Sequence, residues 1–426
     1  MNLKLYRFFS KILGPLIDLY LFYRKNKGKE DPQRFNERLG KSNYPRPEGN
    51  LVWIHAASIG EAISVIPLIK RIQEDYPNLN FLFTTGTVTS YQILERKLPK
   101  KVIHQYVPID RFHVVKRFLN HWKPDFAMWV ESELWPNLVY ETHNTGCPIA
   151  IVNGRMSSYS FEKWKKYDNL INTVLSCFSV CIAQTESDAE RFRLHGATNV
   201  KVIGNLKYEA PALPADPGET GKLISMIGDR QIWLAASTNK GEEEYISFVH
   251  NKVKENNDKL LTVIAPRHPN RSRDILESLK SKGYNVSVRS KNQEITTETD
   301  IYLADTVGEM GIFYRLCGIV FMGGSLIERG GQNPLEAARL ECAILCGMNT
   351  QNFKEIYNQL EKNSAVIVVK DAAELAVKIS MLLSDNEKQD LLSSSALKFI
   401  QSKAGIIDEY MNQLSPYLKP LESNVS

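Results

Sequence analysis

The feature that most constrains this chain is a regular alternation of short apolar runs with segments of helical periodicity. Seven such runs lie between residues 51 and 205, and seven more follow from residue 231; most of them end in polar residues or glycine. This alternation is typical of βαβ units and predicts parallel, doubly wound sheets. The predicted strands are LVWIHA, LNFLFTT, KVIHQYVP, FAMWVE, PIAIVNG, VCIAQT and NVKVIG, then QIWLAAS, KLLTVIAP, YNVSVRS, DIYLADT, GIVFMGG, CAILCG and AVIVVK.

The chain is long enough to predict two domains. Its 426 residues exceed the size at which a single hydrophobic core usually stops growing. Residues 209–222, EAPALPADPGETGK, have the Pro, Gly and acidic composition of a linker. We therefore expect Rossmann-like domains at 31–208 and 223–402 that face each other across a cleft, with a helical tail at 403–426.

Residues 1–30 form a separate basic and apolar segment. Residues 1–50 carry eleven Lys or Arg and five Asp or Glu, so their net charge of +6 exceeds the +5 of the whole chain. An apolar stretch of about 20 residues is interrupted by charges and by Pro15. Interleaved aromatic and basic residues favour a helix that lies in a membrane interface over one that spans it or packs on its own domain.

The charges that flank the apolar stretch, together with the cysteines, indicate the cellular compartment in which such a protein would work. The run RKNKGK follows the apolar stretch, which is typical of the cytoplasmic side of a membrane. No small-residue cleavage site follows, so a signal peptide is disfavoured. Four of the six cysteines form two Cys-x3-Cys pairs in apolar stretches, and neither pair comes with clustered histidines, which favours reduced, buried thiols over disulfides or a metal site. The basic excess is not spread along a groove, so we expect no nucleic-acid partner.

The stretch HAASIGEA (55–62) stands at the change from strand to helix. In an open α/β sheet this position is at the carboxyl edge of the strands, where ligands bind. Small residues there allow a substrate to approach, and Glu61 would point toward it. Glu61 is equally explained as a first-turn acid that offsets the helix dipole. We expect His55 to position neighbouring groups or to be satisfied within the strand.

The segment GGSLIERGGQNPLEAA (323–338) predicts a nucleotide site in the second domain. Pro334 suits the first position of a helix, and glycine-rich turns before it would offer backbone amides to an anion. Glu336 would reach a ribose diol, and Arg267 would supply a guanidinium for phosphate. A pair of glycines before a helix is also common in simple tight turns. The chain has no GxGxxG after its first strand, no GxxxxGK[ST] and no Asp-x-Asp, which disfavours dinucleotide redox, P-loop and metal-chelated sugar-nucleotide chemistry.

These motifs resemble those of the bacterial Kdo (3-deoxy-D-manno-octulosonic acid) transferases of lipopolysaccharide biosynthesis. HAASIGE, TTGTVTS, ESELWPN, GNLKYE, ASTNKGEE, PRHP, GEM and GGSLIERGGQNPLEAA, then NFKEI, occur in the family's order over nearly the whole chain. The resemblance implies an α/β GT-B glycosyltransferase, with no cofactor or metal. It also implies inverting transfer of Kdo from CMP-Kdo to the lipid A precursor (lipid IVA) at the cytoplasmic face of the inner membrane, anchored by the N-terminal segment.

The resemblance also implies roles for individual residues. Glu61 would be the general base, and Glu131 and Lys207 would stabilise the transition state; a surface or domain-interface salt bridge between the last two is the alternative. Gln332 stands where the family often has histidine, and NGRMS (153–157) replaces a more usual NARLS. The predicted CMP-Kdo contacts are Pro266, Arg267, Gly308, Glu309, Met310, Ser325, Asn333, Pro334, Leu335 and Glu336.

Other functions remain open at this point. A nucleotide-sugar 2-epimerase or another nucleotide-sugar transferase could share the fold, and the epimerase would need neither an anchor nor a lipid acceptor. A membrane-bound scaffold without turnover would predict damage at Glu61 or Arg267, and both residues are intact.

Overall fold

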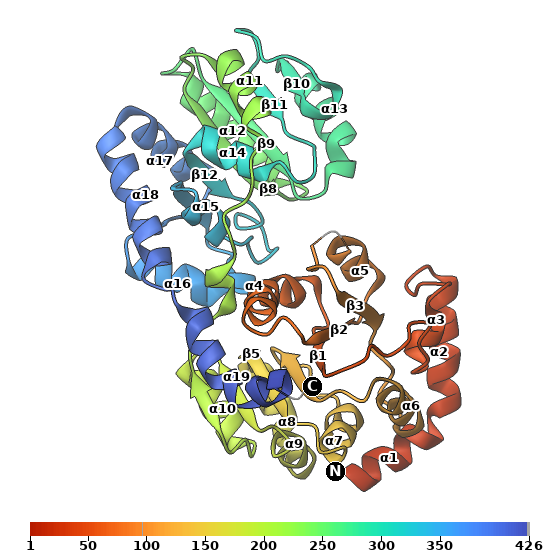
Figure 1. Cartoon of the computed structure of the whole chain (residues 1–426). Helices are drawn as coiled ribbons and strands as arrows, with labels where there is room; N and C mark the ends of the chain where they lie inside the picture. Colours follow the sequence, from red (N-terminus) through yellow and green to blue (C-terminus); the bar gives the residue numbers. More distant parts are fainter. Residues whose placement is uncertain (96, 424–426) are drawn as a thin grey trace. The chain divides into compact units, whose positions relative to one another are not determined.

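The computed structural model describes residues 1–95 and 97–423, which form two compact units (Figure 1). Unit 1 comprises Met1–Ala210 together with the C-terminal segment that begins at Gly405, and unit 2 comprises Pro211–Ala404. Each unit is built on its own seven-stranded sheet, and every described strand pair is parallel. The prediction of two parallel α/β domains is confirmed, and each predicted strand is present.

The sheet of unit 1 has the order β3-β2-β1-β4-β5-β6-β7. From β1 the chain adds β2 and then β3 on one side of β1. It then crosses back to place β4 on the other side of β1, and β5, β6 and β7 follow outward from there. This places a topological switch point between β1 and β4, where open α/β sheets bind ligands. The strands are β1 (Leu51–His55), β2 (Asn80–Thr85), β3 (Val102–Tyr106), β4 (Phe126–Val130), β5 (Ile149–Gly154), β6 (Val180–Ala183) and β7 (Val200–Val202).

Both faces of this sheet are covered, which explains why its strands are apolar throughout. Leu51 and Trp53 belong to one hydrophobic cluster, whereas Val52 and Ile54 belong to the other. Successive strand residues thus point to opposite faces. The helical elements of unit 1 are α1 (Leu3–Ile12), α2 (Gly14–Asn26), α3 (Phe35–Arg38), α4 (Ile59–Asp75), α5 (Val88–Leu94), α6 (Phe112–Trp122), α7 (Pro136–Asn144), α8 (Ser158–Lys165), α9 (Asp168–Leu175), α10 (Glu186–Leu194), the 3-10 helix η1 (Leu206–Glu209) and α19 (Ile406–Ser423).

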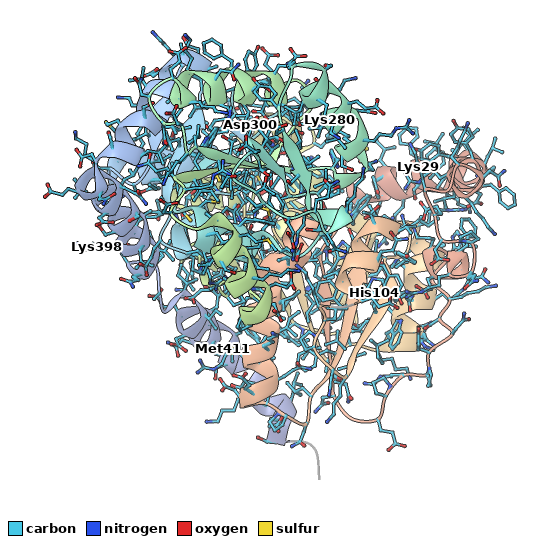
Figure 2. The ribbon with its side chains drawn as sticks, turned by 90° about the horizontal axis from the view of Figure 1, so that it is seen from above. Lys29, His104, Lys280, Asp300, Lys398 and Met411 are labelled. Carbon is cyan, nitrogen blue, oxygen red and sulfur yellow. The ribbon has the colours of Figure 1, made fainter. Side chains whose placement is uncertain are left out.

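The segment predicted as a C-terminal tail is an integral part of unit 1. Helix α19 lies beside α4 (Figure 1) and contributes Tyr410, Met411, Leu414 and Leu418 to the same buried cluster. Figure 2 labels Met411 on this helix. Since these side chains are buried against strands that lie between residues 51 and 183, the chain must leave unit 2 and return to complete unit 1.

The sheet of unit 2 has the order β10-β11-β9-β8-β12-β13-β14, with its switch point between β8 and β12. Its strands are β8 (Ile232–Thr238), β9 (Leu261–Pro266), β10 (Val286–Val288), β11 (Ile301–Leu303), β12 (Ile319–Met322), β13 (Ala343–Gly347) and β14 (Ile367–Val369). Its helical elements are α11 (Pro217–Ile227), α12 (Glu242–Lys254), η2 (Pro269–Arg271), α13 (Ser272–Ser281), η3 (Arg289–Lys291), α14 (Met310–Cys317), α15 (Leu335–Arg339), η4 (Gln351–Phe353), α16 (Lys354–Lys362), α17 (Ala372–Ser384) and α18 (Asn386–Gln401).

The predicted linker at 209–222 is only partly a linker, because its second half is the first turns of α11. Asp216 caps this helix by accepting a hydrogen bond from the backbone N–H of Glu219 (2.8 Å), and Pro217 occupies the first turn. An Asp-Pro-x-Glu sequence is therefore a helix start here. Composition alone had suggested a linker.

The N-terminal segment forms two helices with a break at Leu13, just before Gly14 and Pro15. Among the described residues, no helix is both long enough and apolar enough to cross a membrane, so the structure gives no support to a membrane-spanning helix. Many large side chains of α1 and α2 are nevertheless exposed, including Phe8 (58%) and Leu19 (67%). The six cysteines are free and buried, as expected.

Candidate active site

The predicted catalytic residues of unit 1 meet at the carboxyl edge of its sheet. Glu61 lies in the first turn of α4, directly after β1, and Glu131 is the first residue after β4. Because β1 and β4 are neighbours, both carboxylates flank the switch point. Lys207 reaches the same edge from η1.

The Glu61 side chain folds back onto the start of its own helix. Its two carboxylate oxygens accept hydrogen bonds from the Ala57 backbone N–H (2.9 Å) and from the Ser58 hydroxyl (2.8 Å). Ser58 is also the N-cap, since its oxygen accepts from the Glu61 backbone N–H (3.3 Å). The arrangement resembles a capping box. The helix-start interpretation of Glu61 is therefore realised in the structure, and it leaves each carboxylate oxygen with a further lone pair.

The surroundings of Glu61 make it a stronger base than an ordinary carboxylate. Burial raises the pKa of Glu61 to about 7, and the nearby charges of Glu131 and Glu133 act in the same direction. The hydrogen bonds from Ser58 and Ala57 oppose this shift without cancelling it. A carboxylate that titrates near neutral pH is well matched to general base catalysis.

Glu131 and Lys207 form a half-buried ion pair. Lys207 Nζ donates to Glu131 Oε1 over 3.1 Å, and their side chains are 22% and 14% exposed. Glu131 has a φ of +60°, an unusual value for a residue with a side chain. Such a conformation persists only where its surroundings hold it, and it is common at functional sites. The salt bridge that we considered as an alternative exists, and it lies at the carboxyl edge rather than on a remote surface.

Several residues that hold this site were not singled out from the sequence. Leu206, beside Lys207, donates its backbone N–H to the buried Asn153 Oδ1 (3.0 Å). Tyr410 of α19 accepts from the Asn153 N–H (3.1 Å) and donates to the Gly204 carbonyl (3.0 Å). The run NGR at the end of β5 was a signal for Asn153. No local pattern pointed to Tyr410, which comes from the far end of the chain.

Glu133 and Trp135 complete the polar loop between β4 and α7. Trp135 Nε1 donates to Glu133 Oε2 (2.8 Å), and the indole remains 43% exposed. Burial raises the pKa of Glu133, and the charge of Glu131 raises it further. The charge of Glu131 therefore acts on both Glu61 and Glu133 at this edge of the sheet, and the ammonium group of Lys207 pairs with Glu131.

His55 is a buried structural residue. Its Nδ1 lies 3.0 Å from Thr84 Oγ1, and burial lowers its pKa to about 4. The ring is therefore neutral at physiological pH. This fits the expected positioning role and makes His55 a poor candidate for a cationic group.

In unit 2 the predicted donor-binding segments also gather at the carboxyl ends of neighbouring strands. Pro266 ends β9, and the following Arg267 joins β9 to β8 by donating its backbone N–H to the Thr238 carbonyl (2.9 Å). Its guanidinium is exposed. Gly323 follows β12, where an added Cβ would lie 2.5 Å from the Ser237 carbonyl oxygen, so only glycine fits there.

The predicted anion site at Gly323–Ser325 is occupied by the protein itself. The carboxylate of Glu242, in the first turn of α12, accepts hydrogen bonds from the backbone N–H groups of Gly324 (2.6 Å), Ser325 (3.1 Å) and Leu326 (3.2 Å), and from that of Asn239 (2.9 Å). Glu242 is fully buried. The predicted anion site comprised this turn and a second one at 330–333 before Pro334. Its first part was wrong, because an internal carboxylate already accepts hydrogen bonds from the amides of Gly324 and Ser325.

The other predicted donor contacts differ in how available their side chains are. The Ser325 hydroxyl is paired with the Met322 carbonyl and the Gly347 N–H, and Leu335 is fully buried. Glu309 forms an ion pair with Arg289. Asn333 Oδ1 accepts from the Leu335 N–H (3.2 Å) at the start of α15, which has only five residues.

The remaining donor residues frame two loops. Gly308 has a φ of +92° just before Glu309, and Met310 begins α14. Pro334 is the N-cap of α15 and Glu336 lies in its first turn. The Gln332 carbonyl accepts a hydrogen bond from the Tyr357 hydroxyl (2.8 Å). Among the described residues, no group of three or more His, Cys, Asp or Glu side chains is placed to hold a metal ion.

Comparisons with known proteins agree along the whole chain. A family model described as 3-deoxy-D-manno-octulosonic-acid transferase matches residues 33–210, and one described as glycosyl transferases group 1 matches residues 229–399. The 3-deoxy-D-manno-octulosonic acid transferase of Rickettsia bellii is 34% identical over 417 residues, which are 97% of this chain and 99% of the relative. That of Haemophilus influenzae is 32% identical over 96% of this chain and 97% of the relative.

Solved structures show the same fold at lower identity. The UDP-GlcNAc 2-epimerase of Neisseria meningitidis, bound to UDP-GlcNAc, aligns with a TM-score of 0.58 over 85% of this chain and all of the epimerase chain. The sequences are only 13% identical, so this likeness shows the fold alone.

Proposed function

The chain belongs to the 3-deoxy-D-manno-octulosonic acid (Kdo) transferase family, and from this membership we propose that it moves Kdo from CMP-Kdo to a hydroxyl group of the lipid A precursor, with Glu61 as the general base. That it is a glycosyltransferase of lipopolysaccharide biosynthesis follows from relatives matched over nearly their full length. The observation that supports the catalytic role is the Glu61 carboxylate, held at the switch point of unit 1 with a pKa of about 7.

The proposed transfer is a direct displacement. The acceptor oxygen forms a bond to the anomeric carbon of Kdo while the bond from that carbon to the CMP phosphate oxygen breaks. The acceptor proton passes to Glu61, and CMP departs with the negative charge. Lys207 neutralises the charge of Glu131. This limits the repulsion between Glu131 and the negative charge that develops in the transition state.

We assign donor binding to unit 2. Arg267 offers an exposed guanidinium at the end of β9, and the departing phosphate needs a cation of this kind. The segments 308–310 and 333–336 frame the same carboxyl edge and would hold the nucleotide. A 2-epimerase shares this fold, but membership of the Kdo transferase family does not favour that alternative.

We also propose that the acceptor is met at the cytoplasmic face of the inner membrane. The apolar side chains exposed on α1 and α2 accompany exposed lysines at positions 4, 11, 27 and 29. An apolar face beside positive charge suits an anionic lipid surface. Sedimentation with anionic vesicles measures the binding of the protein to such a surface.

The deciding experiment compares wild type with Glu61→Gln in the presence of CMP-Kdo and tetraacylated lipid A precursor, with product followed by mass. Loss of the base is expected to lower kcat by about a hundredfold to ten-thousandfold. Glu74→Gln, an exposed glutamate on the same helix, is the matched control. Undiminished turnover by Glu61→Gln would remove Glu61 from its role. Turnover of UDP-GlcNAc without a lipid acceptor would support the epimerase alternative.

A further inference from the structure

Helix α1 has two faces with different partners. One face carries Phe8, Phe9 and Ile12, which are 58%, 47% and 56% exposed. The other face carries Tyr6, which contacts Asp110, and Arg7, which contacts Asn137 in the first turn of α7. Figure 1 shows α1 next to α7. Because α7 begins directly after Trp135, this contact touches the end of the loop that carries Glu131.

The contact is centred on Asp110, which lies between β3 and α6. The Tyr6 hydroxyl donates to Asp110 Oδ2 (2.8 Å). The same carboxylate accepts the backbone N–H groups of Asn137 (3.0 Å) and Leu138 (2.7 Å). Helix α7 has no side-chain cap of its own, so Asp110 serves as its cap from another part of the chain.

Arg7 adds a second connection to the same helix. Its Nε donates to the side-chain oxygen of the fully buried Asn137 (3.1 Å), and its guanidinium forms an ion pair with Glu141. The guanidinium carbon also lies 4.8 Å from the centroid of the Phe112 ring. On α2, Asp18 pairs with Arg111, the neighbour of Asp110, over 2.7 Å. The start of α7 is thus contacted directly by α1, whereas α2 is connected to it through Arg111, the neighbour of the capping Asp110.

The loop between β4 and α7 needs such support because of Glu131. Its left-handed conformation is unfavourable for a residue with a side chain and persists only if both flanking segments are fixed. β4 fixes one side, where the Glu131 N–H donates to the Val152 carbonyl (3.0 Å). The capped start of α7 fixes the other side.

We propose that Tyr6, Arg7 and Asp110 form a latch through which α1 positions the Glu131–Trp135 loop, so that contact of α1 with an anionic lipid surface speeds the transfer step. A ten-residue helix is only marginally stable by itself, and about half of the surface of Phe8, Phe9 and Ile12 on its apolar face is exposed. Lipid that buries Phe8, Phe9 and Ile12 stabilises α1 in its latched form and shifts the population toward it. Lys4 and Lys11, both exposed on α1, match the negative charge of that surface.

This inference rests on the proposed function, in which Glu131 acts at the reacting centre. Tyr6, Arg7 and Asp110 are positioning residues, since they touch neither substrate. The latch therefore affects kcat and leaves the KM for CMP-Kdo, which we assign to unit 2, unchanged.

The test uses the full-length chain with vesicles of phosphatidylglycerol, and with phosphatidylcholine vesicles for comparison. Hydrogen exchange of the peptide containing residues 136–141 reports on the amides of Asn137 and Leu138. In wild type, anionic vesicles are expected to slow this exchange and to raise kcat about tenfold, which corresponds to one hydrogen bond to a charged acceptor. Tyr6→Phe should still bind vesicles but lose both responses, whereas Tyr159→Phe, an exposed tyrosine on α8, should keep them.

The two readouts separate the latch from the proposed function. Exchange that is insensitive to both vesicles and Tyr6→Phe overturns the latch, whatever the activity. A change in the KM for CMP-Kdo with constant kcat also overturns it. Slowed exchange that depends on protein concentration rather than on lipid would assign the apolar face to a second copy of the chain. If exchange responds as expected but wild type transfers no Kdo, the latch is supported and the proposed function fails.

Discussion

At the scale of single residues, the site depends on carboxylates in unusual surroundings. Glu61 follows a strand end and begins a helix, as its motif predicted. Its raised pKa could not be predicted, because it depends on burial and on the charges of Glu131 and Glu133, which are 70 and 72 positions away in the sequence. The surroundings of Glu242 could not be predicted either. It stands in a run of three glutamates, and nothing in that run indicates that its carboxylate accepts hydrogen bonds from four backbone amides.

The first prediction at this scale concerns pH. A base with a pKa of about 7 is protonated and inactive below that value, so kcat/KM should rise as pH increases through about 7. Glu133→Gln removes one negative charge near Glu61, which lowers the pKa of Glu61 and moves the acidic limb down by about half a unit. A pH–rate profile measures both. In the control Glu74→Gln, the acidic limb of the profile should stay in place. An acidic limb that also stays in place in Glu133→Gln would contradict this account.

The second prediction concerns the internal anion of unit 2. Glu242→Gln keeps the size of the side chain but loses its charge and turns an N–H₂ group toward backbone donors. We expect the free energy of unfolding of unit 2 to fall by about 2–3 kcal/mol. Hydrogen exchange of the peptide that contains residues 320–330 should accelerate accordingly. Glu244→Gln, the exposed neighbour, is the control; equal behaviour of the two variants would argue against the role of Glu242.

At the scale of elements, the strands were predictable and the long-range partners of the helices were not. The fourteen apolar runs correspond to the fourteen described strands. A strand that is buried on both faces is apolar along its whole length, so its own residues identify it. The linker at 209–222 was misjudged because Asp216 and Pro217 serve equally in loops and in helix starts. Helix α19 gave no signal of its location, since amphipathic periodicity marks a buried face without identifying what covers it.

The prediction at this scale tests how α19 supports the site. Tyr410→Phe removes the hydroxyl that links Asn153 and Gly204, and it leaves a buried N–H unpaired. We expect a loss of about 1–3 kcal/mol in the free energy of unfolding of unit 1, measured by urea denaturation. We also expect kcat to fall, because Asn153 holds the turn that carries Lys207. Tyr417→Phe, which loses a single longer hydrogen bond to the Ser179 carbonyl (3.3 Å), should have the smaller effect. The reverse order would contradict this assignment.

At the scale of the whole molecule, the predicted site residues of each unit gather at the carboxyl edge of its own sheet. The sequence predicted this because each polar or glycine-rich motif follows an apolar run. The N-terminal segment, residues 1–30, adds an end of the chain that is both basic and apolar. Lys29, labelled in Figure 2, is one of its basic residues.

The prediction at this scale concerns that basic and apolar end. Phe8→Ser combined with Ile12→Ser removes two exposed apolar side chains from α1, each worth up to about 1.5–3 kcal/mol when buried in lipid. Affinity for phosphatidylglycerol vesicles should fall at least tenfold, as measured by sedimentation, and binding of wild type should weaken with added salt. Leu194→Ser, which removes an exposed leucine from α10, should bind as wild type does. Equal binding by all three proteins would remove α1 from the membrane interface.

The return of α19 to unit 1 also affects how the protein is made. The ribosome releases the first strands long before it reaches residue 406, so that the part of the apolar cluster that α19 covers stays exposed while the whole of unit 2 is translated. A nascent chain in this condition is a natural client for chaperones. Loss of residues 407–426 would remove Tyr410, Met411, Leu414 and Leu418 from that cluster and leave unit 1 permanently unfinished, however well unit 2 had folded.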